Sequence, residues 1–247
     1  MIKAVIFDLD NTLVDFVKMK EEAVKAAVEG MIDAGLSMDR GEATRKIYEI
    51  YDREGIEYQN VFDQFLIESY GTIDFKILSA GIVAYRKARE ASLVLYPHVR
   101  LTLVEIVKRG KKLAVISDAP RKEAWLRLCS LNIHHFFDYV LTFEDTGHLK
   151  PAPDPFEKAL AMLGISPPEA LMVGDWPERD IVGASKVGIK TVFAKYGDTF
   201  GIFESGADYE IDDIVELLTV IDEIEGNQPD GREYHDTSSE SRGDEEP

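Results

Sequence analysis

Apolar runs of strand length alternate with helical patterns along most of the chain. The three strongest runs all end at polar residues, and they are Ala4–Phe7, Leu113–Ile116 and Ala170–Val173. Because these runs are apolar throughout and do not alternate with polar residues, they are typical of strands buried on both faces of a parallel sheet. Residues 139–142 and 191–194 are weaker candidates for further strands.

Helical periodicity fills the intervals between these strands. The segments are 121–131, 155–163, 181–187 and 213–224. The second segment has a start signal, with Asp154 as the N-cap and Pro155 at the first helical position. Strands that alternate with helices predict an α/β fold, in which a doubly wound, Rossmann-like parallel sheet is connected by right-handed crossovers.

One long interval, residues 15–95, breaks this alternation and shows helical periodicity only. Its four expected helices are 16–33, 39–54, 58–70 and 74–90. We therefore predict an α-helical cap domain over 15–95, inserted between the first and second strands of a core made of 1–14 and 96–224. Such an insertion leaves the sheet where the first strand ends, so the cap should cover that end as a lid.

Charge separates the end of the chain from the rest. The net charge is −18, and residues 225–247 contain eight acidic and two basic side chains but almost no apolar ones. Such a segment cannot bury enough apolar surface to offset the entropy of ordering, so we predict an acidic disordered tail over 225–247. The acidic surface also argues against nucleic acid and anionic membranes as partners.

The single cysteine, Cys129, excludes an internal disulfide framework and favours a reducing compartment. It lies in a helical stripe, where we expect a buried thiol. No apolar run approaches the roughly 20 residues that span a bilayer, and the first strand begins too early for a signal peptide. These features predict a cytoplasmic protein without a membrane partner, and they leave its oligomeric state open.

Polar side chains gather where the predicted strands end. Asp8, Ser117 and Asp175 follow the three strong strands, and Lys150 lies on a connecting segment. In open parallel sheets ligands bind beyond the carboxyl ends of the strands, so these groups should meet at one edge. Crowded carboxylates must share a cation or shift their pKa values upward. A hard dication with oxygen ligands satisfies them, and Mg²⁺ suits such a site.

In this arrangement the chain resembles the haloacid dehalogenase superfamily of phosphohydrolases over roughly residues 1–225. The first motif of that family, two Asp and a Thr at alternate positions, is matched by Asp8-Leu9-Asp10-Asn11-Thr12. The second is matched by Ser117 and the third by Lys150. The fourth, Gly-Asp followed by four residues and a further Asp, is matched by Gly174-Asp175-Trp-Pro-Glu-Arg-Asp180.

The resemblance implies a role for each matched residue. Asp8 would be the nucleophile that forms a phosphoaspartate, Asp10 the general acid and base, and Lys150 the cation that neutralises the transferring group. Thr12 and Ser117 would bind phosphoryl oxygens or orient the acids. The implied metal ligands for Mg²⁺ are Asp8, Asp10 through its backbone carbonyl, Asp175 and Asp180.

Two acidic residues allow a second interpretation. Asp118 replaces the Asn that often follows the second motif, and it could lie beside the phosphate or cap the following helix, which we favour. Asp180 could hold a metal-bound water or Lys150, or it could be the N-cap of the helix that starts near Ile181.

The expected function is that of a Mg²⁺-dependent phosphomonoester hydrolase acting on a small soluble phosphorylated metabolite. Within the family, a phosphomutase and a haloacid dehalogenase-type hydrolase are alternatives, although the latter usually departs from the second Asp of the first motif. A phosphoacceptor signalling module is an alternative from a different class, but such modules are shorter and have no lid.

Overall fold

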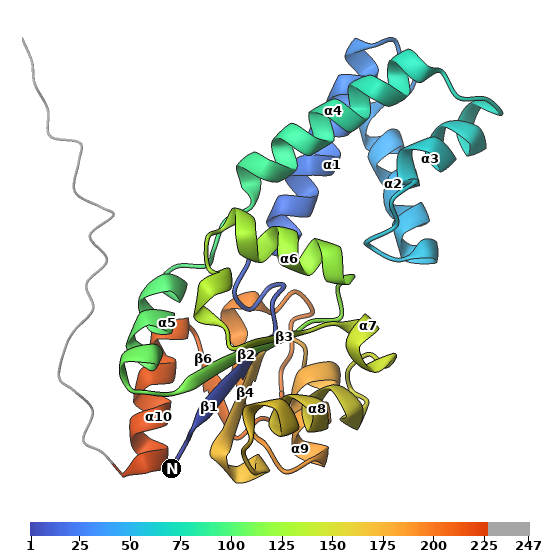
Figure 1. Ribbon diagram of the computed structural model, residues 1–247. Helices are drawn as coiled ribbons and strands as arrows, with labels where there is room; N and C mark the ends of the chain where they lie inside the picture. The colour runs from blue at the N-terminus through green and yellow to red at the C-terminus, as the bar shows by residue number, and fades with distance from the viewer. Residues whose placement is uncertain (227–247) are drawn as a thin grey trace, which may run out of the picture.

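The computed structural model describes residues 1–226, and its centre is a parallel sheet of six strands in the order β3-β2-β1-β4-β5-β6 (Figure 1). The strands are β1 (Ala4–Phe7), β2 (Lys112–Ile116), β3 (Tyr139–Leu141), β4 (Ala170–Gly174), β5 (Lys190–Ala194) and β6 (Tyr209–Ile211). Because β1 pairs in parallel with both β2 and β4, the order of the strands reverses beside it. The predicted doubly wound α/β core is confirmed.

Helices cover both faces of this sheet, as Figure 1 shows. One face packs on α5 (Val99–Lys108), α6 (Arg121–Ser130) and α10 (Leu217–Glu225). The other packs on α8 (Pro153–Leu163) and α9 (Val182–Lys186), with the short α7 (Phe143–Thr146) beside α8. Successive residues of β1 supply the two sides in turn, since Val5 and Phe7 belong to the first layer and Ala4 and Ile6 to the second.

Four helices follow β1 and form a second apolar cluster above the sheet. They are α1 (Phe16–Asp33), α2 (Arg40–Glu54), α3 (Val61–Tyr70) and α4 (Phe75–Ser92). The long helices α1 and α4 pack closely, and a Cβ on Gly30 would lie 2.9 Å from that of Ala84. All four lie within the interval predicted to be helical, while the exact division into core and cap domains stays a prediction.

Two short backbone segments join the four helices to the sheet. The N–H of Asp15 donates to the carbonyl of Val94 at 3.1 Å, and the N–H of Tyr96 donates to the carbonyl of Leu13 at 3.1 Å. The entry and exit of the helical insertion are therefore paired side by side, directly after the Asp8–Thr12 motif. This pairing places the cap above the carboxyl end of β1.

Several local expectations were wrong. Helix α8 begins with Ala152 as its N-cap and Pro153 in the first turn, so Asp154 lies inside the helix. Helix α5 and strand β6 were not predicted. Cys129 is exposed rather than buried, because it lies on the outward side of α6.

The predicted tail largely falls outside the described residues, since its residues 227–247 are not among them. Its first residue is an exception, because Glu225 ends α10 and belongs to the fold. The carboxylate of Glu225 accepts hydrogen bonds from the backbone N–H of Ile2 at 2.9 Å and from Lys111 Nζ at 2.7 Å. Within residues 1–226, none of the helices has the length and apolar character needed to cross a membrane.

Candidate active site

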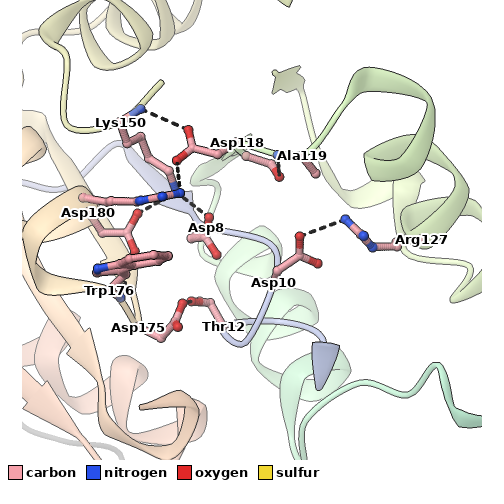
Figure 2. Close-up of polar contacts among 12 residues, drawn as sticks. Asp8, Asp10, Thr12, Asp118, Ala119, Arg127, Lys150, Asp175, Trp176 and Asp180 are labelled. Atoms are coloured by element: carbon pink, nitrogen blue, oxygen red, sulfur yellow. Dashed lines mark hydrogen bonds and ion pairs between the residues drawn. The ribbon is translucent and has the colours of Figure 1, made fainter. Parts of the chain in front are cut away.

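The centre of the site is a buried lysine held between two carboxylates (Figure 2). Asp8 follows β1, and Lys150 lies on the loop before α8. Lys150 Nζ donates to Asp8 Oδ1 in a short ion pair and to Asp180 Oδ1 at 2.6 Å. All three side chains are buried, so these ion pairs are shielded from solvent. Charge-assisted bonds of this kind hold Asp8 in one orientation.

Asp180 reaches this cluster because the chain after β4 forms a single π-helical turn, Pro177–Ile181. Its second oxygen, Oδ2, accepts the backbone N–H of Trp176 at 3.1 Å. The turn folds back over Gly174, where any Cβ would overlap the carboxylate of Asp180. The alternative of an N-cap was wrong, because Ile181 occupies that position before α9.

Asp175 lies on the opposite side of Asp8 from Lys150 in Figure 2, at the end of β4. Its Oδ1 accepts a hydrogen bond from Thr12 Oγ1 at 3.0 Å, and Thr12 is completely buried. The backbone carbonyl of Thr12 in turn accepts from the hydroxyl of Tyr196 at 2.8 Å. The structure thus places Thr12 behind Asp175, where it orients the acid.

The residues after β2 support the lysine loop. Asp118 Oδ1 accepts the backbone N–H of Lys150 at 3.0 Å, and its Oδ2 accepts from Arg179 Nη1 at 3.0 Å. The favoured interpretation of Asp118 as a helix cap was wrong, since Pro120 is the N-cap residue of α6. Ser117 Oγ accepts the N–H of Ala119 at 3.1 Å, and both residues face the cavity described next.

These groups line a cavity of about 180 Å³. Its wall contains Asp8, Asp10, Ser117, Asp118, Lys150, Asp175 and Asp180 from the predicted set. The cap contributes Phe16, Ile56 and Glu57, and the fourth motif region adds Trp176 and Arg179. The cavity therefore lies between the sheet edge and the cap, as expected for a site covered by a lid.

Asp10 points away from the lysine and toward α6, as Figure 2 shows. Its Oδ2 accepts from Arg127 Nη1 at 2.8 Å, while its Oδ1 is buried and has no hydrogen-bond partner within residues 1–226. The other end of the guanidinium, Nη2, forms a short ion pair with Glu57, which lies between α2 and α3 of the cap. One cation from the core thus bridges Asp10 and a carboxylate of the cap.

Burial raises the pKa of several acids in this site. The pKa of Asp8 is raised well above its usual value by burial, against the opposing effect of Lys150, and Asp180 and Asp175 raise it further. Burial, together with Asp180, raises the pKa of Asp175 to about 8. For Lys150 the effect of burial is outweighed by Asp180 and Asp8, which raise its pKa. Negative charge therefore exceeds positive charge at this point.

A dication fits this donor set. One oxygen from each of Asp8, Asp175 and Asp180 lies within 4.8 Å of the others, and Lys150 pairs with two of these three carboxylates. Carboxylate oxygens are hard donors, which suits Mg²⁺. The carboxylate of Asp10 is not part of this group of three, because it faces Arg127.

The structure brings together all the predicted strand-end residues, and it adds others that the sequence did not indicate. These are Arg127, Glu57, Arg179 and Asn11. The backbone of Asn11 has a positive φ of 59°, and its side chain accepts the N–H of Val17, which turns the chain from Asp10 into the cap. The Asp-Asn pair after a strand was a usable signal for this turn. Nothing in the helical pattern distinguished Arg127 from a solvated arginine.

Comparison with known proteins agrees with the fold and the site. The sequence model of the haloacid dehalogenase-like hydrolase family matches residues 5–194 of this chain. A protein of Methanocaldococcus jannaschii named glyceraldehyde 3-phosphate phosphatase is 37% identical over 224 residues, which cover 90% of this chain and 97% of that protein. A protein of the same name from Pyrococcus furiosus is 35% identical, over 92% of this chain and 95% of its own length.

A solved structure gives the same result. The chain superposes on a haloacid dehalogenase-type phosphatase from Thermococcus onnurineus with a TM-score of 0.66 and 25% identity, covering 89% of this chain and 98% of that one. The chain therefore belongs to the haloacid dehalogenase-like hydrolases, and within them it is a phosphatase. The names of these relatives favour a phosphatase over the signalling module, the carbon–halogen hydrolase and the phosphomutase that the sequence left as alternatives.

Proposed function

We propose that the chain hydrolyses phosphomonoesters of small metabolites with Mg²⁺, through a phosphoaspartate on Asp8. The observation that carries this proposal is the contact of Lys150 with both Asp8 and Asp180, with Asp175 alongside, at the bottom of a cavity that also contains Asp10. A carboxylate, a buried ammonium and a set of hard oxygen donors are the groups that phosphoryl transfer to a carboxylate requires.

In the first step an oxygen of Asp8 attacks phosphorus and forms an acyl phosphate, while the bond from phosphorus to the ester oxygen breaks. The departing oxygen takes a proton from Asp10. Lys150 neutralises charge on the equatorial oxygens as they become more negative. Arg127 fixes the carboxylate of Asp10 in the wall of the cavity that also contains Asp8 and Lys150, which supports this role.

In the second step a water molecule attacks phosphorus, and Asp10 removes a proton from it. The bond between phosphorus and the Asp8 oxygen breaks, so inorganic phosphate leaves and the carboxylate is restored. Asp8, Asp175, Asp180 and the backbone carbonyl of Asp10 would hold Mg²⁺, which when bound supplies positive charge that lets phosphate approach the acids. The cap residues Phe16, Ile56 and Glu57 exclude bulk water from this space.

For the substrate we propose a three-carbon phosphate of the glyceraldehyde 3-phosphate type. The support is the name carried by two proteins that match this chain over nine-tenths of its length. A small leaving group also suits a cavity of about 180 Å³.

The test is phosphate release from glyceraldehyde 3-phosphate with Mg²⁺ and after chelation, by the natural protein and three variants. Asp8→Asn should abolish turnover and the mass increase of one phosphoryl group in acid-quenched protein. Asp10→Asn should lower kcat by about 10² to 10⁴, the usual contribution of general acid–base catalysis. The matched control is Asp33→Asn, since Asp33 is exposed at the far end of α1.

Turnover by Asp8→Asn at the natural rate would refute the covalent mechanism. Full activity after removal of divalent metal would refute the Mg²⁺ dependence but not the nucleophile. An inactive natural protein on every phosphate ester of a panel would refute the proposed reaction itself.

A further inference from the structure

A second cavity adjoins the catalytic cavity on the side of Asp10. It has a volume of about 290 Å³ and lies between α1, α4 and α6, and we refer to it as the Lys20 cavity. Phe16 and Glu57 line both spaces. Arg127, which holds Asp10, lines the Lys20 cavity as well. The two cavities are thus neighbours that share Phe16 and Glu57 in their walls.

The direction of the substrate follows from the proposed chemistry. The phosphoryl group lies at Asp8 and Lys150, and the leaving oxygen must lie beside Asp10 to receive its proton. The rest of the leaving group therefore continues beyond Asp10, toward Arg127 and Glu57. On that side the Lys20 cavity is the adjoining space.

The cations around the Lys20 cavity differ in how they are paired. Arg127 is paired with Asp10 and Glu57, and Arg89 is paired with Glu123 at 3.3 Å. Lys20 is only 5% exposed, and among residues 1–226 its one hydrogen bond goes to the hydroxyl of Tyr85 at 3.0 Å.

An ammonium carries three donors, so two donors of Lys20 remain for a ligand. The rings of Tyr51 and Tyr85 lie 4.2 and 5.6 Å from Nζ and stabilise the charge only in part. Burial lowers the pKa of Lys20, and the nearby carboxylate of Glu57 offsets this effect only in part. Such a buried cation lowers stability, which is a reason to expect a function for it.

We propose that Lys20 donates a hydrogen bond to an oxygen of the leaving group and thereby determines substrate specificity. The inference rests on the proposed phosphatase function and narrows its substrate class. The preferred esters carry a carbonyl, hydroxyl or carboxylate oxygen a few bonds away from the ester oxygen. Esters with a purely hydrocarbon leaving group leave Lys20 without its partner and are poor substrates.

The experiment compares glyceraldehyde 3-phosphate with propyl phosphate, which has the same number of carbons and no oxygen beyond the ester. The readout is the ratio of their kcat/KM values in the natural protein, in Lys20→Met and in Lys25→Met. Because a hydrogen bond to a charged donor accounts for about 10- to 100-fold, Lys20→Met should lower this ratio by that factor. Lys25 is exposed on the same helix, so Lys25→Met should keep the ratio.

An unchanged ratio in Lys20→Met would overturn the proposal, as would an equal loss on both esters, which indicates a structural role. A second measurement is independent of turnover. Calorimetric titration of glyceraldehyde 3-phosphate into Asp8→Asn and into Asp8→Asn/Lys20→Met should show about 10- to 100-fold weaker binding by the double variant. Equal affinities of the two variants would overturn the role of Lys20, whether or not the protein turns over the ester. If only the proposed reaction were wrong, the protein would show no turnover but the two variants would still differ in affinity.

Discussion

Replacing Arg127 by Met removes the cation that pairs with both Asp10 and Glu57 of the cap. The guanidinium is 7% exposed, and the side chains of Asp10 and Glu57 are 23% and 21% exposed. Without Arg127 both carboxylates lose their ion pair, and Asp10 loses the only hydrogen bond recorded for its carboxylate among residues 1–226. We therefore expect effects on both stability and catalysis.

The expected loss in the free energy of unfolding follows from these exposed fractions. Removing one partner of a buried ion pair costs about 3–5 kcal/mol, and exposed pairs contribute about 0–1 kcal/mol. Since Asp10 and Glu57 are each about one-fifth exposed, we expect Arg127→Met to lower the free energy of unfolding by about 2–3 kcal/mol. Adding Glu57→Gln should recover part of this loss, because a single carboxylate then remains.

The catalytic effect should depend on the leaving group. An unanchored Asp10 retains part of its contribution, so kcat/KM for an alkyl phosphate should fall by about 10- to 100-fold. For 4-nitrophenyl phosphate the fall should be much smaller, since that leaving group needs little protonation. Steady-state kinetics on both esters, together with urea denaturation, measures the two effects.

The matched control is Arg109→Met. Arg109 forms a two-pronged ion pair with Asp222 of α10, away from both cavities, so this variant should lose stability without a change in leaving-group dependence. If Arg127→Met kept its kcat/KM on the alkyl ester, or lost the same factor on both esters, the idea that Arg127 positions Asp10 would be refuted.

Three further expectations concern single side chains. Gly174→Ala should lower kcat by about tenfold or more, because its methyl would displace the Asp180 carboxylate from Lys150, and normal kinetics would contradict that close approach. Asp175→Asn should raise the Mg²⁺ concentration for half-maximal activity by about tenfold or more, and an unchanged metal titration would count against a ligand role. Burial lowers the pKa of Lys20 to about 8, so its charged form disfavours folding by up to about 3 kcal/mol below that pH. The penalty disappears as pH rises from about 8 toward 10.5, the pKa of Lys20 in the unfolded chain. Lys20→Met should therefore be more stable than the natural protein at pH 7 but not at pH 10.5. Urea denaturation at the two pH values measures this difference.

The sequence predicted the sheet well wherever a strand is buried on both faces. The runs that became β1, β2 and β4 are apolar throughout, and they occupy the middle of the sheet beside one another. Strand β6 escaped notice because it is an edge strand with a partly exposed Tyr209 and an exposed Glu210, so no apolar run marks it. Helix α5 was missed although its buried face, which includes Val99, Leu103 and Ile106, repeats at helical spacing.

At the site, the strand ends placed Asp8, Ser117 and Asp175 correctly at one edge, because parallel strands bring their carboxyl ends together. The environments of Asp118 and Asp180 were harder to predict. A residue at the start of a helix pattern is a natural cap, and local sequence favours that interpretation. In the folded chain, contacts with distant residues decide instead. Lys150 donates a charge-assisted hydrogen bond to Asp180, and Arg179 donates one to Asp118, and these bonds are stronger than a cap to a backbone N–H.

Arg127 and Lys20 could not be predicted because their environments depend on contacts between distant parts of the chain. Arg127 and Lys20 are ordinary helical cations by their sequence, and most such side chains are solvated. Arg127 is buried where α6 meets the segment containing Glu57, and Lys20 is buried against Tyr51 and Tyr85 of neighbouring cap helices. Both environments arise from parts of the chain far apart in sequence. Under the proposed role of Lys20, substrate specificity depends on a position where local sequence carries little information. Substitutions at Lys20 and Arg127 should consequently separate specificity and acid–base positioning from the proposed phosphoryl transfer at Asp8, which depends on the strand ends and on Lys150.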